Sequence, residues 1–168
     1  MTSLYQVSIP VFIRILSNLS TLLDKGAAHA EAKKYDPSVL VNARLAPDMF
    51  PLARQVQVAS DSAKGLAARL AGVEVPSWPD EEKTIPELQA RIAKTIDYLK
   101  SFKPEQIDGQ EDRTVTMKAG ANEYSFKGID FLLGFAIPNL FFHVTTAYNI
   151  LRHNGVEVGK MDYLGKVA

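Results

Sequence analysis

The stretch 48–72, DMFPLARQVQVASDSAKGLAARLAG, decides the fold class of this chain. Its apolar residues recur at alternating steps of three and four: Met49, Leu52, Val56, Ala59, Ala63, Leu66 and Leu70. This spacing puts one apolar stripe on a helix, and the alanines within it let a neighbouring helix approach closely. We therefore predict a helix that opens at Asp48, a good N-cap, and ends at Gly72. Pro51 is tolerated in its first turn.

Three other segments show the same helical periodicity. The first has an apolar strip formed by Ile9, Phe12, Leu16, Leu19 and Leu23. We expect Pro10 to bend this helix or delay its start, and Gly26 to lie close to its end. Residues 27–47 then form a mixed connection, for which we predict one or two short helical turns.

The next segment carries a capping box, in which Thr84 caps the helix and Glu87 reaches back to it. Its apolar face consists of Ile85, Leu88, Ile92, Ile96, Leu99 and Phe102. The last helix is predicted over 130–153, with a seam of Leu133, Ile137, Leu140, Val144, Ala147 and Leu151. Between these helices, residues 113–128 (RTVTMKAGANEYSFKG) alternate apolar and polar side chains around a glycine-containing turn, which indicates a β-hairpin.

These four amphipathic helices predict an all-α protein, an antiparallel four-helix bundle with a small β-hairpin between its third and fourth helices. A chain of 168 residues is expected to form a single domain over 1–168. Around 131–142 the last helix is apolar on nearly every face, and one bundle core cannot cover all of that surface. We therefore expect a homodimer.

Composition narrows the classes of function. Nineteen basic residues balance nineteen acidic ones and the sequence pI is near 6.8, so nucleic acid is not an expected partner. The absence of cysteine removes thiolate metal sites and a cysteine nucleophile, and it fits a cytoplasmic protein. No apolar run reaches about eighteen residues and the N-terminus lacks a basic leader, so we expect neither a membrane span nor a signal peptide.

Two of the three histidines, His143 and His153, lie in the last predicted helix. Their spacing makes them point about 80° apart and lie about 15 Å apart along the axis. Because zinc–nitrogen bonds are only about 2 Å long, one ion cannot bind both. A helical partner four residues after His143 would stand at Ala147. We interpret His143 as a packed ring with a backbone or hydroxyl partner, and His153 as a cation in the last helical turn.

His143 nevertheless marks the best candidate pocket in the sequence. Thr146 and Tyr148 bring hydroxyl groups to its flank, and Asp61 offers a carboxylate from the helix over 48–72. Three charged residues interrupt that helix away from its seam: Arg54, Asp61 and Lys64. We expect this face to be solvated, with Asp61 and Lys64 forming an ion pair. The candidate pocket thus comprises His143, Tyr148, Thr146 and Asp61, with no metal and no cofactor.

Two long motifs carry a family resemblance, LAPDMFPLARQVQVASDSAKGLAARLAGVE (45–74) and FLLGFAIPNLFFHVTTAYNILRHNGVEVGKMDYLG (131–165). With the layout between them, they resemble an uncharacterised bacterial and fungal family known only as a domain of unknown function, numbered nineteen-ninety-three. That family is similar in fold to the DinB/YfiT-like superfamily of four-helix bundles, many of which are dimeric.

The resemblance implies a metal site that this sequence matches at one position. Superfamily members with known chemistry bind a divalent metal through a histidine of the second helix and an HxxxH pair on the last. Several are thiol-dependent transferases or isomerases. His143 matches one histidine of the last-helix pair, whereas Ala147 stands at the partner position and residues 48–72 contain no histidine.

We therefore predict a cytoplasmic, homodimeric DinB-like bundle that lacks the metal triad and acts as a small-molecule-binding or interaction module. The alternative is an enzyme, a metal- or thiol-dependent transferase that uses His143 with nonstandard ligands. A third hypothesis is a dimer with a purely structural role.

Overall fold

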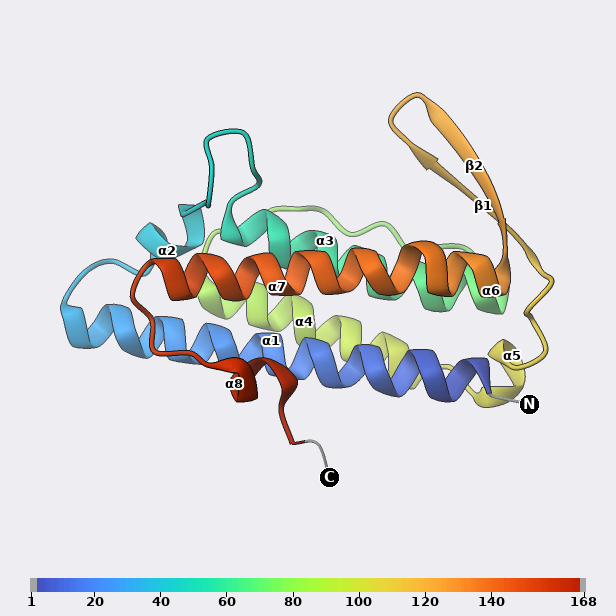
Figure 1. Cartoon of the computed structure of the whole chain (residues 1–168), viewed down its shortest axis with the longest axis horizontal. Helices are drawn as coiled ribbons and strands as arrows, with labels where there is room; N and C mark the ends of the chain where they lie inside the picture. The colour runs from blue at the N-terminus through green and yellow to red at the C-terminus, as the bar shows by residue number, and fades with distance from the viewer. Residues whose placement is uncertain (1–2, 167–168) are drawn as a thin grey trace.

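The computed structural model describes residues 3–166 of the chain, which are mostly helical with one small sheet. Four long helices lie side by side (Figure 1): α1 (Leu4–Lys33), α3 (Leu52–Ala71), α4 (Ile85–Lys100) and α7 (Ile137–His153). The shorter helices are α2 (Ser38–Asn42), α5 (Pro104–Ile107), α6 (Gly128–Phe131) and α8 (Lys160–Leu164). A π-helical turn, η1 (Leu132–Ala136), joins α6 to α7.

The apolar seams predicted from periodicity form the core. On α3, the six seam residues within the helix are all fully buried: Leu52, Val56, Ala59, Ala63, Leu66 and Leu70. On α4, Thr84 accepts a hydrogen bond from the Glu87 N–H, and the Glu87 carboxylate accepts one from the Thr84 N–H. The predicted capping box is therefore confirmed.

The predicted end of the first long helix and the predicted start of the second are wrong. Helix α1 starts at Leu4, capped by Ser3, and runs through Pro10. Gly26 lies inside it, buried where the side chains of Leu151 and Leu40 approach the backbone. A Cβ at this position would lie 3.1 Å from Leu151 Cδ2, a tight contact, so this residue serves close packing rather than helix termination.

Helix α3 starts at Leu52 instead of opening at Asp48. Pro51 adopts an extended conformation with ψ of 167° and disfavours helical geometry at the preceding Phe50. The helix ends as predicted at Gly72, whose φ is 70°.

The helices do not alternate in direction throughout. Gln57, near the start of α3, bonds to Glu82, just before the start of α4, and the chain from 72 to 84 returns along the length of the helices (Figure 1). Helices α3 and α4 therefore run in the same direction, joined by this crossover. The expectation of antiparallel neighbours fails for this pair because the 72–84 loop is long enough to return.

The π-helical turn shifts the seam of the last helix. Leu133 is 55% exposed, although the periodicity places it in the core, and Leu132 and Ala136 are buried instead. A π-helical turn contains more residues than an α-helical turn, so it rotates the preceding residues relative to those that follow. Beyond it, Leu140, Val144, Ala147 and Leu151 are buried as predicted.

The predicted hairpin is confirmed. Strands β1 (Thr114–Ala119) and β2 (Asn122–Lys127) pair antiparallel, with Val115 opposite Phe126. Figure 1 shows the hairpin projecting from the helices near α6. It contacts the core through Val115, which is buried, through Met117, and through Phe126, whose ring lies 5.9 Å from that of Phe131.

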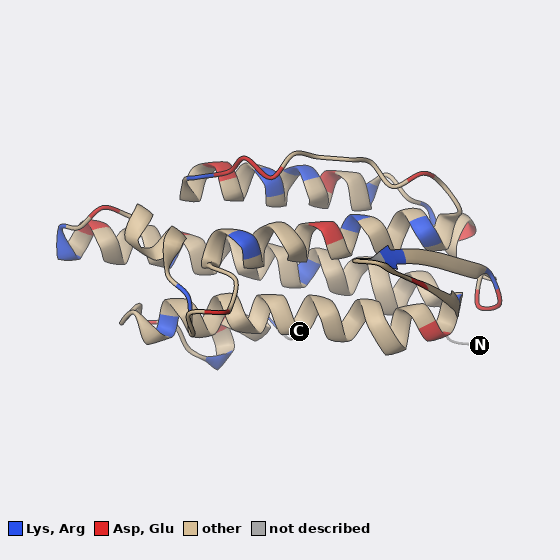
Figure 2. Ribbon diagram, turned by 90° about the horizontal axis from the view of Figure 1, so that it is seen from above, with Lys and Arg blue, Asp and Glu red and all other residues tan. Residues whose placement is uncertain are grey.

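Two helical spans are long and apolar enough to cross a membrane by length and composition, Leu4–Lys33 and Gly128–His153. Core helices of bundles pass the same test, and these two pack against each other. Residues 131–151 contain no Asp, Glu, Lys or Arg, and Figure 2 shows this helix free of charged residues between its ends. The predicted absence of a membrane partner stays a prediction.

Candidate functional site

Several charged residues form a network of ion pairs where the 72–84 loop crosses α3 and α4. Arg91 of α4 stands at the centre, with its side chain only 2% exposed. Its guanidinium donates to Asp61 Oδ1 at 2.8 Å and to Glu82 Oε1 at 3.0 Å, and it lies 2.9 Å from Asp80 Oδ1. It also donates to the carbonyl of Pro79 at 2.9 Å. One arginine thus ties the loop to both helices.

Further bonds extend this network along α3. The Gln57 amide donates to Glu82 Oε2 at 3.0 Å, and Arg54 pairs with Asp80. Lys64 lies 2.8 Å from Asp61 Oδ1, which confirms the predicted i, i+3 pair. The face itself is not solvated as predicted, because the loop covers it and leaves Lys64 only 5% exposed.

The pKa of Glu82 reflects this surrounding network. Burial by itself would raise the pKa of Glu82, but hydrogen bonds from its own backbone, Arg91 and Gln57, together with the Arg91 charge, bring it below the usual value. Glu82 is therefore ionised at neutral pH and holds the loop as an anion.

Arg91 keeps one polar atom without a partner. Its Nε–H is buried and makes no hydrogen bond within residues 3–166. A buried donor left unpaired costs about 1–3 kcal/mol. The network therefore holds Arg91 in place although one of its donors stays unpaired.

Trp78, the single tryptophan of the chain, lies at one end of this network. The ammonium groups of Lys64 and Lys94 lie 4.5 and 4.4 Å from its ring centroid. Such cation–π contacts each contribute roughly 0.5–1 kcal/mol at exposed sites. They fix the indole against both α3 and α4.

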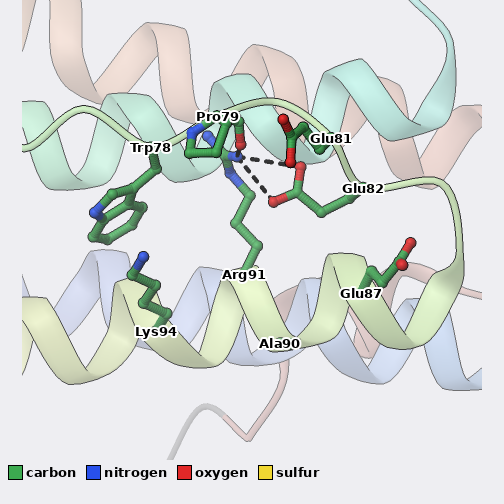
Figure 3. Close-up of a pocket in the computed structure, with 8 residues that line it drawn as sticks. All are labelled: Trp78, Pro79, Glu81, Glu82, Glu87, Ala90, Arg91 and Lys94. Carbon is green, nitrogen blue, oxygen red and sulfur yellow. Dashed lines mark hydrogen bonds and ion pairs between the residues drawn. The ribbon is translucent and has the colours of Figure 1, made fainter.

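A cavity of about 350 Å³ opens between the loop and α4. Its lining consists of Trp78, Pro79, Glu81, Glu82, Glu87, Ala90, Arg91 and Lys94. Figure 3 shows Trp78 and Lys94 on one side of Arg91, and the three glutamates on the other. We refer to this space as the Trp78 cavity. Its volume falls within the usual range for small-ligand sites, about 300–1,000 Å³.

His143 lies elsewhere, between α7 and α3. It is buried, its Nδ1 lies 2.7 Å from Gln55 Oε1, and the edge of the Phe142 ring packs against it. The Gln55 amide nitrogen donates to the carbonyl of Phe50, so its oxygen must face His143. Nδ1 therefore carries the proton, and Nε2 keeps the lone pair. The packed-ring interpretation is correct, but the partner is a side-chain amide.

Burial lowers the pKa of His143, and the nearby charge of Arg54 lowers it further. The imidazole is consequently neutral at pH 7. A neutral imidazole with a free Nε2 resembles a metal ligand, since such a ligand usually donates its other N–H to an oxygen.

The donor set around His143 does not fit the divalent metal that the superfamily resemblance implies. Its neighbour on α3 is the neutral amide Gln55, and Ala147 stands one turn along α7. Within residues 3–166, no group of three or more His, Cys, Asp or Glu side chains is arranged to hold a metal ion.

The four residues of the predicted pocket lie in three different places. Asp61 belongs to the Arg91 network, and Thr146 donates back to the carbonyl of Phe142 within α7. Tyr148 donates to the carbonyl of Val158 and lines a smaller cavity of about 190 Å³ beside α8. Of the four, only Tyr148 lines either this cavity or the Trp78 cavity in the described part of the chain.

The Trp78 cavity was not among the predicted sites, although the sequence carries one signal of it. On α4, Arg91 occupies a position among Leu88, Ile92 and Thr95, all of which are buried. An arginine inside an apolar stripe predicts a buried charge that needs acidic partners. The nearest acidic cluster, Asp80–Glu82, directly precedes that helix.

The chain matches a known protein family and a solved structure. The family model for the Domain of unknown function (DUF1993) matches residues 4–164. The chain is also similar to the crystal structure of a DinB family member protein from Shewanella denitrificans, with 45% sequence identity and a TM-score of 0.89. That match covers 98% of this chain and 93% of the other. No curated protein matches the chain. Both resemblances read from the sequence are therefore confirmed.

Proposed function

The chain belongs to the DUF1993 family, whose function is unknown, and we propose that it is a DinB-like four-helix bundle that binds a small molecule in the Trp78 cavity. The cavity itself carries this proposal. It combines an aromatic ring, a buried arginine and several carboxylates within one concave space. Such a mixture of apolar surface and a few polar groups is typical of ligand sites.

Trp78 provides a fluorescent probe for a binding assay. Because it is the single tryptophan, fluorescence excited selectively from tryptophan rather than from the six tyrosines reports on this cavity. The chain is titrated with a panel of neutral, cationic, anionic and zwitterionic small molecules, and thermal unfolding is followed in parallel. We expect at least one compound to change the Trp78 emission and raise the Tm.

The control is Ala90→Phe. Ala90 lines the cavity from an exposed position on α4, so a phenylalanine fills the cavity without entering the core. A genuine ligand loses its effect on this variant, which itself should fold normally. An effect that persists in Ala90→Phe would place binding elsewhere and refute the proposal.

We further propose that two copies associate through the outer face of the last helix. Leu133 and Phe142 are 55% and 56% exposed there, and residues 131–151 carry no charge. A charge-free face can pair with itself in a two-fold dimer without like-charge repulsion. Light scattering should give the mass of a dimer for the native chain and of a monomer for Phe142→Glu. A native monomer would contradict this.

A cytoplasmic location belongs to the same proposal, since the chain has no cysteine. The alternative function, a metal- or thiol-dependent transferase, rests on the free Nε2 of His143. Metal analysis of protein purified without chelator tests it. Stoichiometric zinc or nickel that is lost in His143→Ala would favour the enzyme.

A further inference from the structure

The charges around the Trp78 cavity are ordered along α4. Glu87 lies in the first turn of the helix, and Lys94 follows seven residues later on the same face. Seven residues correspond to about 10.5 Å along a helix axis. The positive charge of the buried Arg91, between them, is already paired with Asp61, Asp80 and Glu82. The cavity therefore has an acidic end and a basic end.

The acidic end presents carboxylate oxygens that form no ion pair within residues 3–166, although the charge of Lys83 acts on Glu87. Glu81 is exposed and makes no side-chain hydrogen bond or ion pair to the described residues. In Glu87, one oxygen accepts the capping hydrogen bonds, which leaves the other free. These capping bonds also lower the pKa of Glu87, so it is an anion at neutral pH. An ammonium group is the complement of such an end.

The basic end presents one available cation. Lys64 is buried and paired with Asp61 at 2.8 Å, whereas Lys94 is exposed and forms no ion pair with the described residues. Its ammonium group instead lies over the ring of Trp78. A carboxylate that entered this end would pair with Lys94 and contact the indole.

Resting on the proposed function, we propose that the ligand of the Trp78 cavity is a zwitterion with well-separated charges, its ammonium at Glu81 and Glu87 and its carboxylate at Lys94. The separation sets its length. An extended chain of three residues spans at most about 10–11 Å, close to the axial separation of about 10.5 Å between positions 87 and 94 of the helix. Short peptides and ω-amino acids of equal length share this chemistry.

The experiment titrates the native chain with triglycine and follows Trp78 fluorescence and calorimetry. Three derivatives accompany it: N-acetyl-triglycine lacks the ammonium, triglycine amide lacks the carboxylate, and the doubly blocked peptide lacks both. We expect each single block to weaken binding about threefold to tenfold, and the double block to abolish it. An ω-amino acid of the same length tests whether the peptide groups contribute.

Variants assign the charges to their ends. Lys94→Gln should reduce the affinity for triglycine but leave that for triglycine amide unchanged, because the amide no longer uses Lys94. Glu81→Gln should affect triglycine but not its N-acetyl form. Lys100→Gln is the matched control, since Lys100 lies on the same helix outside the cavity lining. It should behave as the native chain.

The outcomes separate this inference from the proposed function. If a neutral or singly charged compound of the panel binds and is blocked by Ala90→Phe while the zwitterions do not bind, the zwitterion inference is wrong and the small-molecule site stands. If triglycine, the ω-amino acid and every compound of the panel fail to bind, both the zwitterion inference and the proposed function are wrong.

Discussion

Replacement of Arg91 by methionine tests the centre of the charged network. Methionine keeps most of the apolar stem of the side chain but lacks the guanidinium group and so removes every hydrogen bond to the loop. Removing one partner of a buried ion pair costs about 3–5 kcal/mol when the other stays buried. Here the side chains of Asp61 and Asp80 are 35% exposed and that of Glu82 is 16% exposed, so water can solvate them again. We therefore expect a loss of about 2–3 kcal/mol in the free energy of unfolding.

The assay is urea unfolding followed both by far-UV circular dichroism and by Trp78 fluorescence. Because Arg91 also donates to the Pro79 carbonyl, the variant should release the 72–84 loop and shift the native Trp78 emission to longer wavelength. Arg14→Met, at an exposed position of α1, is the control and should change stability by no more than about 0.5 kcal/mol. A loss below about 0.5 kcal/mol in Arg91→Met, with unchanged emission, would refute the view that Arg91 holds the loop.

Three further predictions concern single side chains. Thr84→Ala removes the cap of α4 and should cost about 1 kcal/mol in urea unfolding, whereas no change would show that the capping box contributes nothing. The folded-state pKa of Glu82 lies below its ordinary value of 4.5. The stability that ionised Glu82 contributes is therefore present above pH 4.5 and is lost as the pH falls through the lowered pKa. Glu82→Gln should flatten this acid limb in a plot of urea midpoint against pH. The folded-state pKa of His143 is also lowered. The stability that neutral His143 contributes is therefore fully present above pH 6.5, its ordinary pKa, and decreases as the pH falls below that value. In His143→Gln that decrease near pH 6 should shrink, and an identical curve would contradict the assignment.

The helical core could be predicted because local sequence determines it. The seams of α3 and α4 follow from periodicity. The start of α4 follows from the capping box, whose two residues, Thr84 and Glu87, are only three positions apart. The hairpin likewise follows from alternation around a short turn. The direction of the helices could not be predicted, since it depends on whether the 72–84 loop turns back or returns along the whole length.

The candidate site was predictable only in part for the same reason. Asp61 and Lys64 pair within one helix, and that pair was expected. Arg91 stands thirty positions from Asp61 in sequence, and only the crossover brings them together. The predicted pocket grouped His143, Thr146 and Tyr148 of one helix flank with Asp61 of another helix. In the folded chain, Thr146 and Tyr148 make contacts away from that imidazole.

The π-helical turn at Leu132–Ala136 has a consequence for comparisons between relatives. Successive helical residues differ in direction by about 100°, so one additional residue in a turn changes the face on which every earlier position lies. A relative with a regular α-helix here would align with a one-residue gap at this turn. Residues before the gap and residues after it, including His143, would then require separate superpositions. Roles assigned by counting along the helix from the hairpin would be placed on the wrong side.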